Sequence, residues 1–183
     1  MYKWDKTSFM EIRSVIKSQL QELREDPNPS DETNVDITVL KCLEEHMDET
    51  LEVVEEKSKP VVWVGACLLP EILMAMDVHM YMCELLLGLG AWTRPDILRK
   101  YNQVGESAGL APEMCAAAKA GLGELLSRAL PPPDLFIANS LPCDNLVIAY
   151  QLYQHALPDV PLLVVDAPYG NTEEDLDYFG NEM

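Results

Sequence analysis

Four short apolar runs, separated by segments with helical periodicity, constrain the fold of this chain more than any other feature. The first run, residues 61–66, is continuously apolar, as expected of a parallel strand buried on both faces. Strands that alternate with helices are typical of an α/β fold with a doubly wound, mostly parallel sheet of Rossmann-like or flavodoxin-like topology. The expected strands are residues 61–66, 78–84, 134–140 and 161–166.

Apolar residues at helical spacing account for most of the remaining chain. Two helices are expected before the first strand, at residues 8–23 and 40–54, and the second has an acidic face that we expect to be solvated. We therefore expect a helical amino-terminal segment, residues 1–58, followed by an α/β domain, residues 59–183. Further helices are expected at residues 69–76, 95–102, 112–128 and 144–155, with Gly105 and Gly109 in a loop and an acidic helical segment from Thr172.

The formal net charge of −18 limits the partners that this chain can bind. Nucleic acid and anionic membranes are both bound through Lys and Arg side chains, so we expect neither as a partner. No apolar run reaches the roughly 20 residues that span a bilayer. The amino terminus leads into a polar amphipathic pattern and not into a signal peptide. We therefore expect a cytoplasmic protein without a membrane span.

The five cysteines are an odd number and include no C-x-x-C pair, so neither a zinc ribbon nor a thioredoxin motif is indicated. Free or metal-bound thiols in a reducing compartment fit this pattern better than a disulfide framework. Cys42 and Cys83 fall within apolar patterns and are expected to be packing residues. Cys67 directly follows the first strand and is expected near the carboxyl edge of the sheet, where we favour a core residue over a third functional thiol.

Cys115 and Cys143 are the candidate metal ligands. Cys143 lies where the third expected strand ends and a helix begins, and Cys115 lies one turn into a helix that Pro112 can open. The carboxyl edge of an α/β sheet binds ligands, and a helix amino terminus favours a thiolate. The pair could hold an iron–sulfur cluster, but its spacing is not diagnostic. On the residues alone, two small buried hydrophobes remain the alternative.

Glu71 is the candidate catalytic carboxylate, because it is expected at the start of a helix beside the same edge. It could act as a general acid or base, or it could only complement the helix dipole, which is the default interpretation. His46, His79 and His155 are not spaced as a ligand pair and are expected to be core or surface residues. No P-loop, G-x-G-x-x-G or G-x-S-x-G motif occurs, which argues against ATP hydrolysis by this chain and weakens a hydrolase interpretation.

Taken in order and spacing, four segments resemble the 2-hydroxyacyl-CoA dehydratase and benzoyl-CoA reductase family, and in particular its 2-hydroxyglutaryl-CoA dehydratase D-component. The resemblance covers roughly residues 55–180. No single segment is specific, but four in order favour the iron–sulfur interpretation well beyond the cysteines alone. The segments are VVWVGACLLPEILMA (61–75), PEMCAAAKAGLG (112–123), DLFIANSLPCDN (134–145) and PLLVVDAPYG (161–170).

This resemblance implies a subunit that pairs with a related second subunit, each with a cysteine-bound 4Fe–4S cluster near an acyl-CoA substrate. A separate ATP-dependent iron–sulfur activator supplies an electron of very low potential. The dehydratases expel a hydroxyl group through a ketyl radical, and the reductases reduce an aromatic ring. By the same resemblance, Cys115 and Cys143 would be cluster ligands, and Glu71 would lie where the family keeps a carboxylate near the active site.

The chain departs from the family pattern in two ways. The third cluster cysteine of the family comes from a second, downstream α/β domain that this chain does not contain, and Pro70 directly precedes Glu71, one place later than expected. The chain is therefore expected to be the amino-terminal part of a subunit, a subunit completed by a partner, or a degenerate subunit, and we favour the first. Two alternatives are a non-catalytic α/β interaction subunit without a cluster and a family member that reduces small non-CoA substrates.

Overall fold

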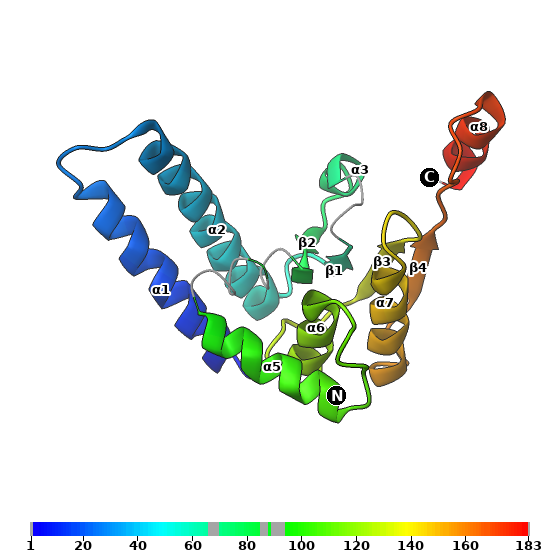
Figure 1. The fold of residues 1–183 in the computed structure, drawn as a ribbon, viewed down its shortest axis with the longest axis horizontal. Coiled ribbons are helices and arrows are strands. Elements are labelled where there is room, and N and C mark those ends of the chain that lie inside the picture. Colours follow the sequence, from blue (N-terminus) through cyan, green and yellow to red (C-terminus); the bar gives the residue numbers. More distant parts are fainter. Residues whose placement is uncertain (1, 66–69, 85–87, 89–93, 183) are drawn as a thin grey trace.

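A computed structural model describes residues 2–65, 70–84, 88 and 94–182 (Figure 1). In these residues, a parallel sheet of four strands confirms the expected doubly wound α/β fold. The strands, in the spatial order β2–β1–β3–β4, are β1 (Val61–Val64), β2 (His79–Tyr81), β3 (Leu135–Asn139) and β4 (Leu162–Val165). The helices are α1 (Thr7–Arg24), α2 (Asp31–Glu56), α3 (Pro70–Met74), α5 (Pro95–Ser107), α6 (Ala116–Leu126), α7 (Asp144–Ala156) and α8 (Glu173–Glu182).

The strand order places a topological switch point between β1 and β3. The chain passes from β1 to β2 on one side and returns to β3 on the other, as in flavodoxin-like sheets. Trp63 of β1 lies opposite both Tyr81 of β2 and Phe136 of β3 in the parallel register. Ligands of open α/β sheets bind beyond the carboxyl ends of the strands at such a point. The segments that follow β1 and β3 are therefore the first place to look for a site.

One face of the sheet carries an aromatic core. The ring centroids of Trp63 and Phe136 are 5.4 Å apart, and Tyr153 of α7 packs edge-on against Trp63 at 5.8 Å. Such aromatic pairs contribute about 0.5–1.5 kcal/mol beyond the area that they bury. The same buried cluster continues into Ile16 of α1 and Leu40 of α2. The amino-terminal helices therefore share their buried surface with the sheet.

The opposite face of the sheet is aliphatic and has a thinner cover. Val62 of β1 and Ile137 of β3 are buried there, and Leu73 of α3 and Phe179 of α8 pack over this cluster. The helix α3 is only five residues long, and α8 has no buried residue. Figure 1 shows α3 beside β1 and β2, and α8 beyond the end of β4. In the described residues, this face has much less helical cover than the aromatic face.

The helices α1 and α2 form a hairpin, and α2 begins with a capping box. The Ser30 hydroxyl accepts a hydrogen bond from the Thr33 backbone N–H at 3.1 Å, and the Thr33 hydroxyl accepts one from the Ser30 N–H at 3.2 Å. The sequence pattern placed the start of α2 near residue 40, because the preceding turns are largely exposed and lack an apolar stripe. No helix in the described part of the chain combines the length and hydropathy needed to cross a membrane.

Gly105 lies inside α5, and its expected place in a loop was wrong. A Cβ atom on Gly105 would lie 2.3 Å from the Lys119 carbonyl oxygen of α6, and one on Gly123 of α6 would lie 2.0 Å from the Tyr101 carbonyl oxygen of α5. The two helices thus approach so closely that only glycine fits at the contact. Gly109 does lie in the loop after α5, where its φ of 106° suits glycine.

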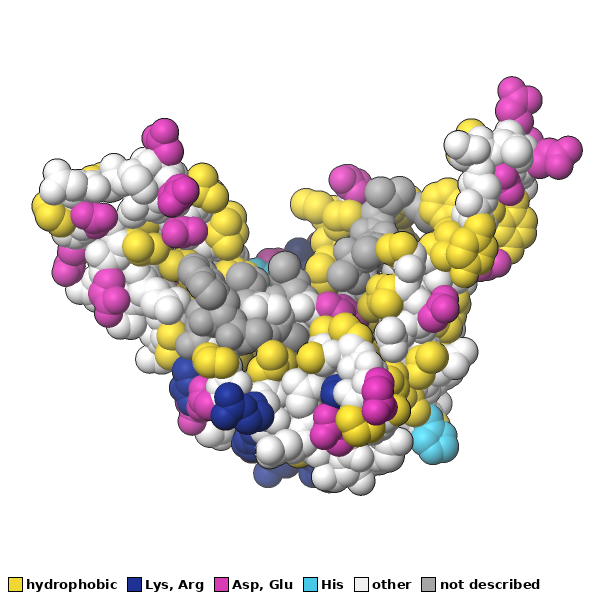
Figure 2. All heavy atoms as spheres, in the orientation of Figure 1, with side chains coloured by type: hydrophobic (Ala, Val, Ile, Leu, Met, Phe, Trp, Pro, Cys, Tyr) yellow, Lys and Arg dark blue, Asp and Glu magenta, His cyan; other side chains and the backbone are white. Residues whose placement is uncertain are grey.

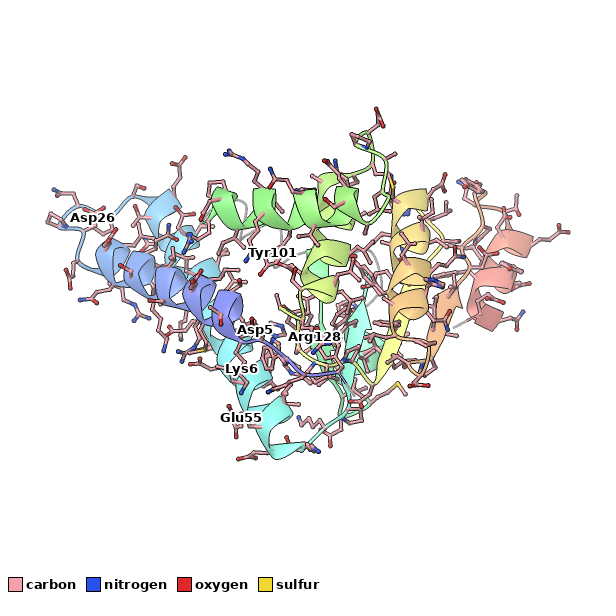
Figure 3. All side chains as sticks on the ribbon, turned by 90° about the horizontal axis from the view of Figure 1, so that it is seen from below. Asp5, Lys6, Asp26, Glu55, Tyr101 and Arg128 are labelled. Atoms are coloured by element: carbon pink, nitrogen blue, oxygen red, sulfur yellow. The ribbon has the colours of Figure 1, made fainter. Side chains whose placement is uncertain are left out.

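Residues 2–6 anchor the start of the chain to the segment that follows α6. The Tyr2 hydroxyl donates a hydrogen bond to the Leu130 carbonyl at 2.9 Å. The Asp5 backbone N–H donates to the Arg128 carbonyl at 2.7 Å, and Figure 3 shows these two residues close together. Segments far apart in the sequence are therefore joined at the base of the molecule.

Candidate functional site

Cys143 lies at the switch point, between the end of β3 and the start of α7. It is the N-cap residue of α7, with an extended backbone (φ −131°, ψ 110°), and its side chain makes no capping hydrogen bond. The side chain is half-buried and packs against the aromatic core cluster. The expectation of a thiol between a buried strand and a helix is thus met, and the sulfur is not engaged in capping the helix. Its role as a metal ligand remains a prediction.

The loop that carries this thiol is held from both sides. Asn139 is only 5% exposed, and its amide nitrogen donates a hydrogen bond to the Leu141 carbonyl. The Ser140 hydroxyl accepts a hydrogen bond from the Ala167 N–H at 2.9 Å, which ties the loop to the segment after β4. Gly65, which follows β1, lies close to the Asn139 side chain: a Cβ atom on Gly65 would lie 3.0 Å from Asn139 Oδ1. The neighbouring strands therefore fix the position of the loop.

Cys115 is the N-cap residue of α6, and its side chain is exposed and makes no capping hydrogen bond. From the sequence, Pro112 was expected to open this helix and Cys115 to lie one turn inside it. The helix instead begins at Ala116, and Pro112 lies in the turn before it. Lys119, which is 7% exposed, donates hydrogen bonds from Nζ to Glu106 Oε1 at 2.7 Å and to the Pro112 carbonyl at 2.5 Å. A buried ammonium group therefore ties the turn before the thiol to α5 and α6.

The helices that begin at these two cysteines pack against each other. Helices that connect parallel strands run antiparallel to them, so α6 and α7 both begin on the carboxyl side of the sheet (Figure 1). Their amino termini offer unpaired backbone N–H groups and a positive dipole end on the same side. Among the described residues, no group of three or more His, Cys, Asp and Glu side chains has metal-binding geometry. The two thiols are therefore not part of a complete metal-binding group among the residues that the structure describes.

Glu71 lies in the first turn of α3 and is exposed to solvent. The helix follows β1, so the carboxylate lies beyond the carboxyl end of that strand, as expected. Its role as an acid or base remains a prediction. Cys67, which precedes it, lies outside the described residues.

Glu84, which lies three residues after the end of β2, carries a buried carboxyl group that was not among the predicted site residues. Burial raises the pKa of Glu84 to about 7, and neither carboxylate oxygen has a hydrogen-bond partner among the described residues. Burial, and then the nearby Cys83 and Glu84, also raise the pKa values of Tyr150 and Tyr153 on α7. A carboxyl group that titrates near neutrality can donate or accept a proton. The sequence signal that could have identified this group is a single carboxylate, Glu84, inside an otherwise apolar run.

The structure also places the cysteines and histidines that were expected to be core or surface residues. Cys83 is fully buried in the aromatic core cluster, as expected, but Cys42 is exposed on α2 because the apolar stripe turns away from it. The rings of His46 and His79 stack with centroids 5.1 Å apart, and burial lowers the pKa of both, to about 4 for His46. These are core histidines, as expected. His79 Nε2 also lies 2.8 Å from the Thr50 hydroxyl.

A cavity of about 670 Å³ lies away from the two cysteines, at the amino end of β1. Val53, Lys57, Val61 and Asp134 are among its lining residues. Because the ligand-binding edge of an α/β sheet is the opposite one, this cavity is not part of the candidate site.

The fold and the site together define a doubly wound α/β protein with cysteine thiols at the amino ends of two adjacent helices. The model of the 2-hydroxyglutaryl-CoA dehydratase D-component family matches residues 66–183. The match covers well over half of the chain, so the chain belongs to this family, and the resemblance drawn from four segments is confirmed. The protein is accordingly a 2-hydroxyacyl-CoA dehydratase-like subunit. Comparison with individually curated proteins finds no match.

Proposed function

We propose that this protein is a subunit, or the amino-terminal part of one, of an iron–sulfur enzyme that acts on a CoA thioester with an electron of low potential. The observation that carries the proposal is the position of Cys115 and Cys143, two unengaged N-cap thiols on helices that pack together. Thiolates are the usual ligands of iron–sulfur clusters. Two helix amino termini favour both the thiolates and the negative charge of a cluster. The residues present therefore fit two of the ligands of a 4Fe–4S cluster.

Each part of the chain has a distinct role in this proposal. When bound, the cluster supplies single-electron transfer and an iron atom that can accept an oxygen ligand. The amino-terminal N–H groups of α6 and α7 stabilise its negative charge, and the aromatic core beneath Cys143 keeps water from that side. Glu71 holds or moves a proton beside the thioester. A related second subunit completes the enzyme, and an ATP-dependent iron–sulfur activator supplies the electron. The remaining cluster ligands come from a downstream α/β domain or from a protein partner.

The test is anaerobic reconstitution of the full-length protein with iron and sulfide, followed by metal analysis and electron paramagnetic resonance of the reduced sample. We expect a brown protein that contains both elements. Cys143→Ala and Cys115→Ala should each lose most of the bound iron, because thiolates dominate cluster binding. Cys42→Ala is the matched control, since Cys42 is exposed on α2, and it should retain the iron. Full-length protein that stays colourless under strict anoxia would contradict the proposal.

A non-catalytic interaction subunit without a cluster is the second candidate. It is favoured by the lack of a complete metal-binding group among the described residues. If it is correct, simultaneous replacement of Cys115 and Cys143 by Ala leaves both partner binding and the activity of the assembly unchanged. Reduction of a small non-CoA substrate is distinguished from both by direct measurement of acyl-CoA binding.

A further inference from the structure

Basic residues are absent from the half of the molecule that contains the sheet. All 13 Lys and Arg residues lie in residues 3–59 and 94–128. The segments 60–93 and 129–183, which supply the four strands with α3, α7 and α8, contain none. In Figure 2 most dark blue side chains lie low in the view, and none is visible over α8. The half that contains the sheet therefore carries acidic side chains with no basic side chain of its own to balance them.

The same half exposes apolar side chains around the face of the sheet that has little helical cover among the described residues. We call this region the α3–α8 surface. It consists of Ile72 and Met74 of α3, Leu163 of β4 and Leu176 of α8. Met74 is 69% exposed, Leu163 51% and Leu176 63%. Exposed apolar side chains that gather around an incompletely covered sheet face mark an interaction surface more than an ordinary solvent surface.

Acidic side chains surround this apolar region. Glu71 lies on α3, Asp166 follows β4, and the first turn of α8 contains Glu173, Glu174 and Asp175. An isologous contact with a second copy of this chain would bring these carboxylates against each other, and like charges at an interface are costly. Complementarity instead favours an occupant with an apolar centre and a basic rim.

We propose that the α3–α8 surface docks a separate protein subunit that presents an apolar patch rimmed by Lys and Arg. The proposal does not depend on the cluster or on the substrate, because it follows from the exposed apolar side chains and the charges around them alone.

The test uses the full chain and two synthetic amphipathic helices with the same apolar face, one flanked by Lys and the other by Glu. Fluorescence anisotropy should show binding of the Lys-flanked helix and little binding of the Glu-flanked helix. Binding should weaken as NaCl rises from about 50 mM to about 300 mM, because rim charges are screened. The double variant Leu163→Gln/Leu176→Gln should weaken it by about tenfold or more, since it removes apolar contact area. Val35→Gln/Val39→Gln, on exposed apolar positions of α2, is the matched control and should bind as the wild type does.

Three results would overturn the docking proposal. If the Leu163→Gln/Leu176→Gln variant binds the Lys-flanked helix as tightly as the wild type does, the attraction is due to net charge alone. If neither helix binds, or if both bind equally, the partner does not have an apolar patch rimmed by Lys and Arg. Light scattering that shows a dimer of this chain, abolished by the same double variant, would assign the surface to a second copy. None of these measurements uses iron or CoA, so the docking and cluster proposals fail independently.

Discussion

Glu124 is fully buried in α6, and burial raises the pKa of its carboxyl group to about 8. In the unfolded chain the same group has an ordinary pKa of 4.5. The unfolded state therefore releases this proton at a lower pH than the folded state does. The contribution of Glu124 to stability is fully present below about pH 4.5 and is lost progressively as the pH rises to about 8.

Glu124→Gln should accordingly raise the melting temperature by several degrees at pH 8 and have a much smaller effect at pH 5. The amide keeps the shape of the side chain and cannot ionise. Thermal unfolding followed by circular dichroism at several pH values measures the difference. Glu113→Gln, at an exposed position before α6, should leave the melting temperature unchanged throughout. A gain that did not vary with pH would show that ionisation of Glu124 is not the cause.

Lys119 is the residue that fixes the turn before Cys115. Lys119→Met removes the hydrogen bonds to Glu106 and to the Pro112 carbonyl, so amide exchange across residues 108–115 should rise by about tenfold or more. In the reconstituted protein, iron should also be lost faster. Hydrogen–deuterium exchange with mass spectrometry measures the first effect. Lys119→Arg keeps the charge and should restore most of the protection, whereas unchanged exchange in Lys119→Met would contradict this role.

At the scale of the elements, the contact between α5 and α6 depends on glycine. Gly123→Ala places a Cβ atom 2.0 Å from the Tyr101 carbonyl oxygen, which is backbone and cannot turn aside. The helices must separate, and overpacking of this kind costs about 1–3 kcal/mol. Denaturant unfolding measures the loss. Gly180→Ala of α8 is the control, because a Cβ atom there meets nothing within 4 Å, and it should be neutral or slightly stabilising.

The elements also show what local sequence patterns reveal. The strand β1 was predictable because a parallel strand buried on both faces is a continuous apolar run. The other three were predictable as short apolar runs between helical patterns, but β2 is limited to His79–Tyr81, and Cys83 and Glu84, expected in that strand, are helical. The position of Cys143 at a helix start was predictable from the boundary between a strand and a helical pattern. Cys115 was expected near a helix start, but one turn inside a helix opened by Pro112, whereas it is the N-cap residue. Gly105 was misplaced because a glycine required by a neighbouring helix has the same local sequence signal as a loop glycine. The burial of Glu84 was missed because it results from tertiary packing and leaves no periodic signal.

At the scale of the whole molecule, the helices α1 and α2 and the sheet share one buried cluster. The expected division at residue 58 follows the change in sequence pattern, but Ile16 and Leu40 lie on one side of it and Trp63 and Tyr153 on the other. We predict that residues 59–183 produced alone bind a hydrophobic dye and lack the near-ultraviolet dichroism of packed aromatic rings, because their core would be exposed. A soluble fragment with native dichroism and cooperative unfolding would show that the two parts fold independently.

The uneven distribution of charge also has a kinetic consequence. Residues 60–93 and 129–183 contain 12 acidic and no basic residues, whereas residues 1–59 and 94–128 contain 19 acidic and 13 basic ones, so the net charge is more negative in the half that contains the sheet. The molecule is therefore an electric dipole. Its long-range field turns it toward a positively charged surface before the two touch, and such steering accelerates encounter. Added salt should therefore slow the association of this protein with a basic partner much more than it hastens dissociation, because separation depends chiefly on short-range apolar contact.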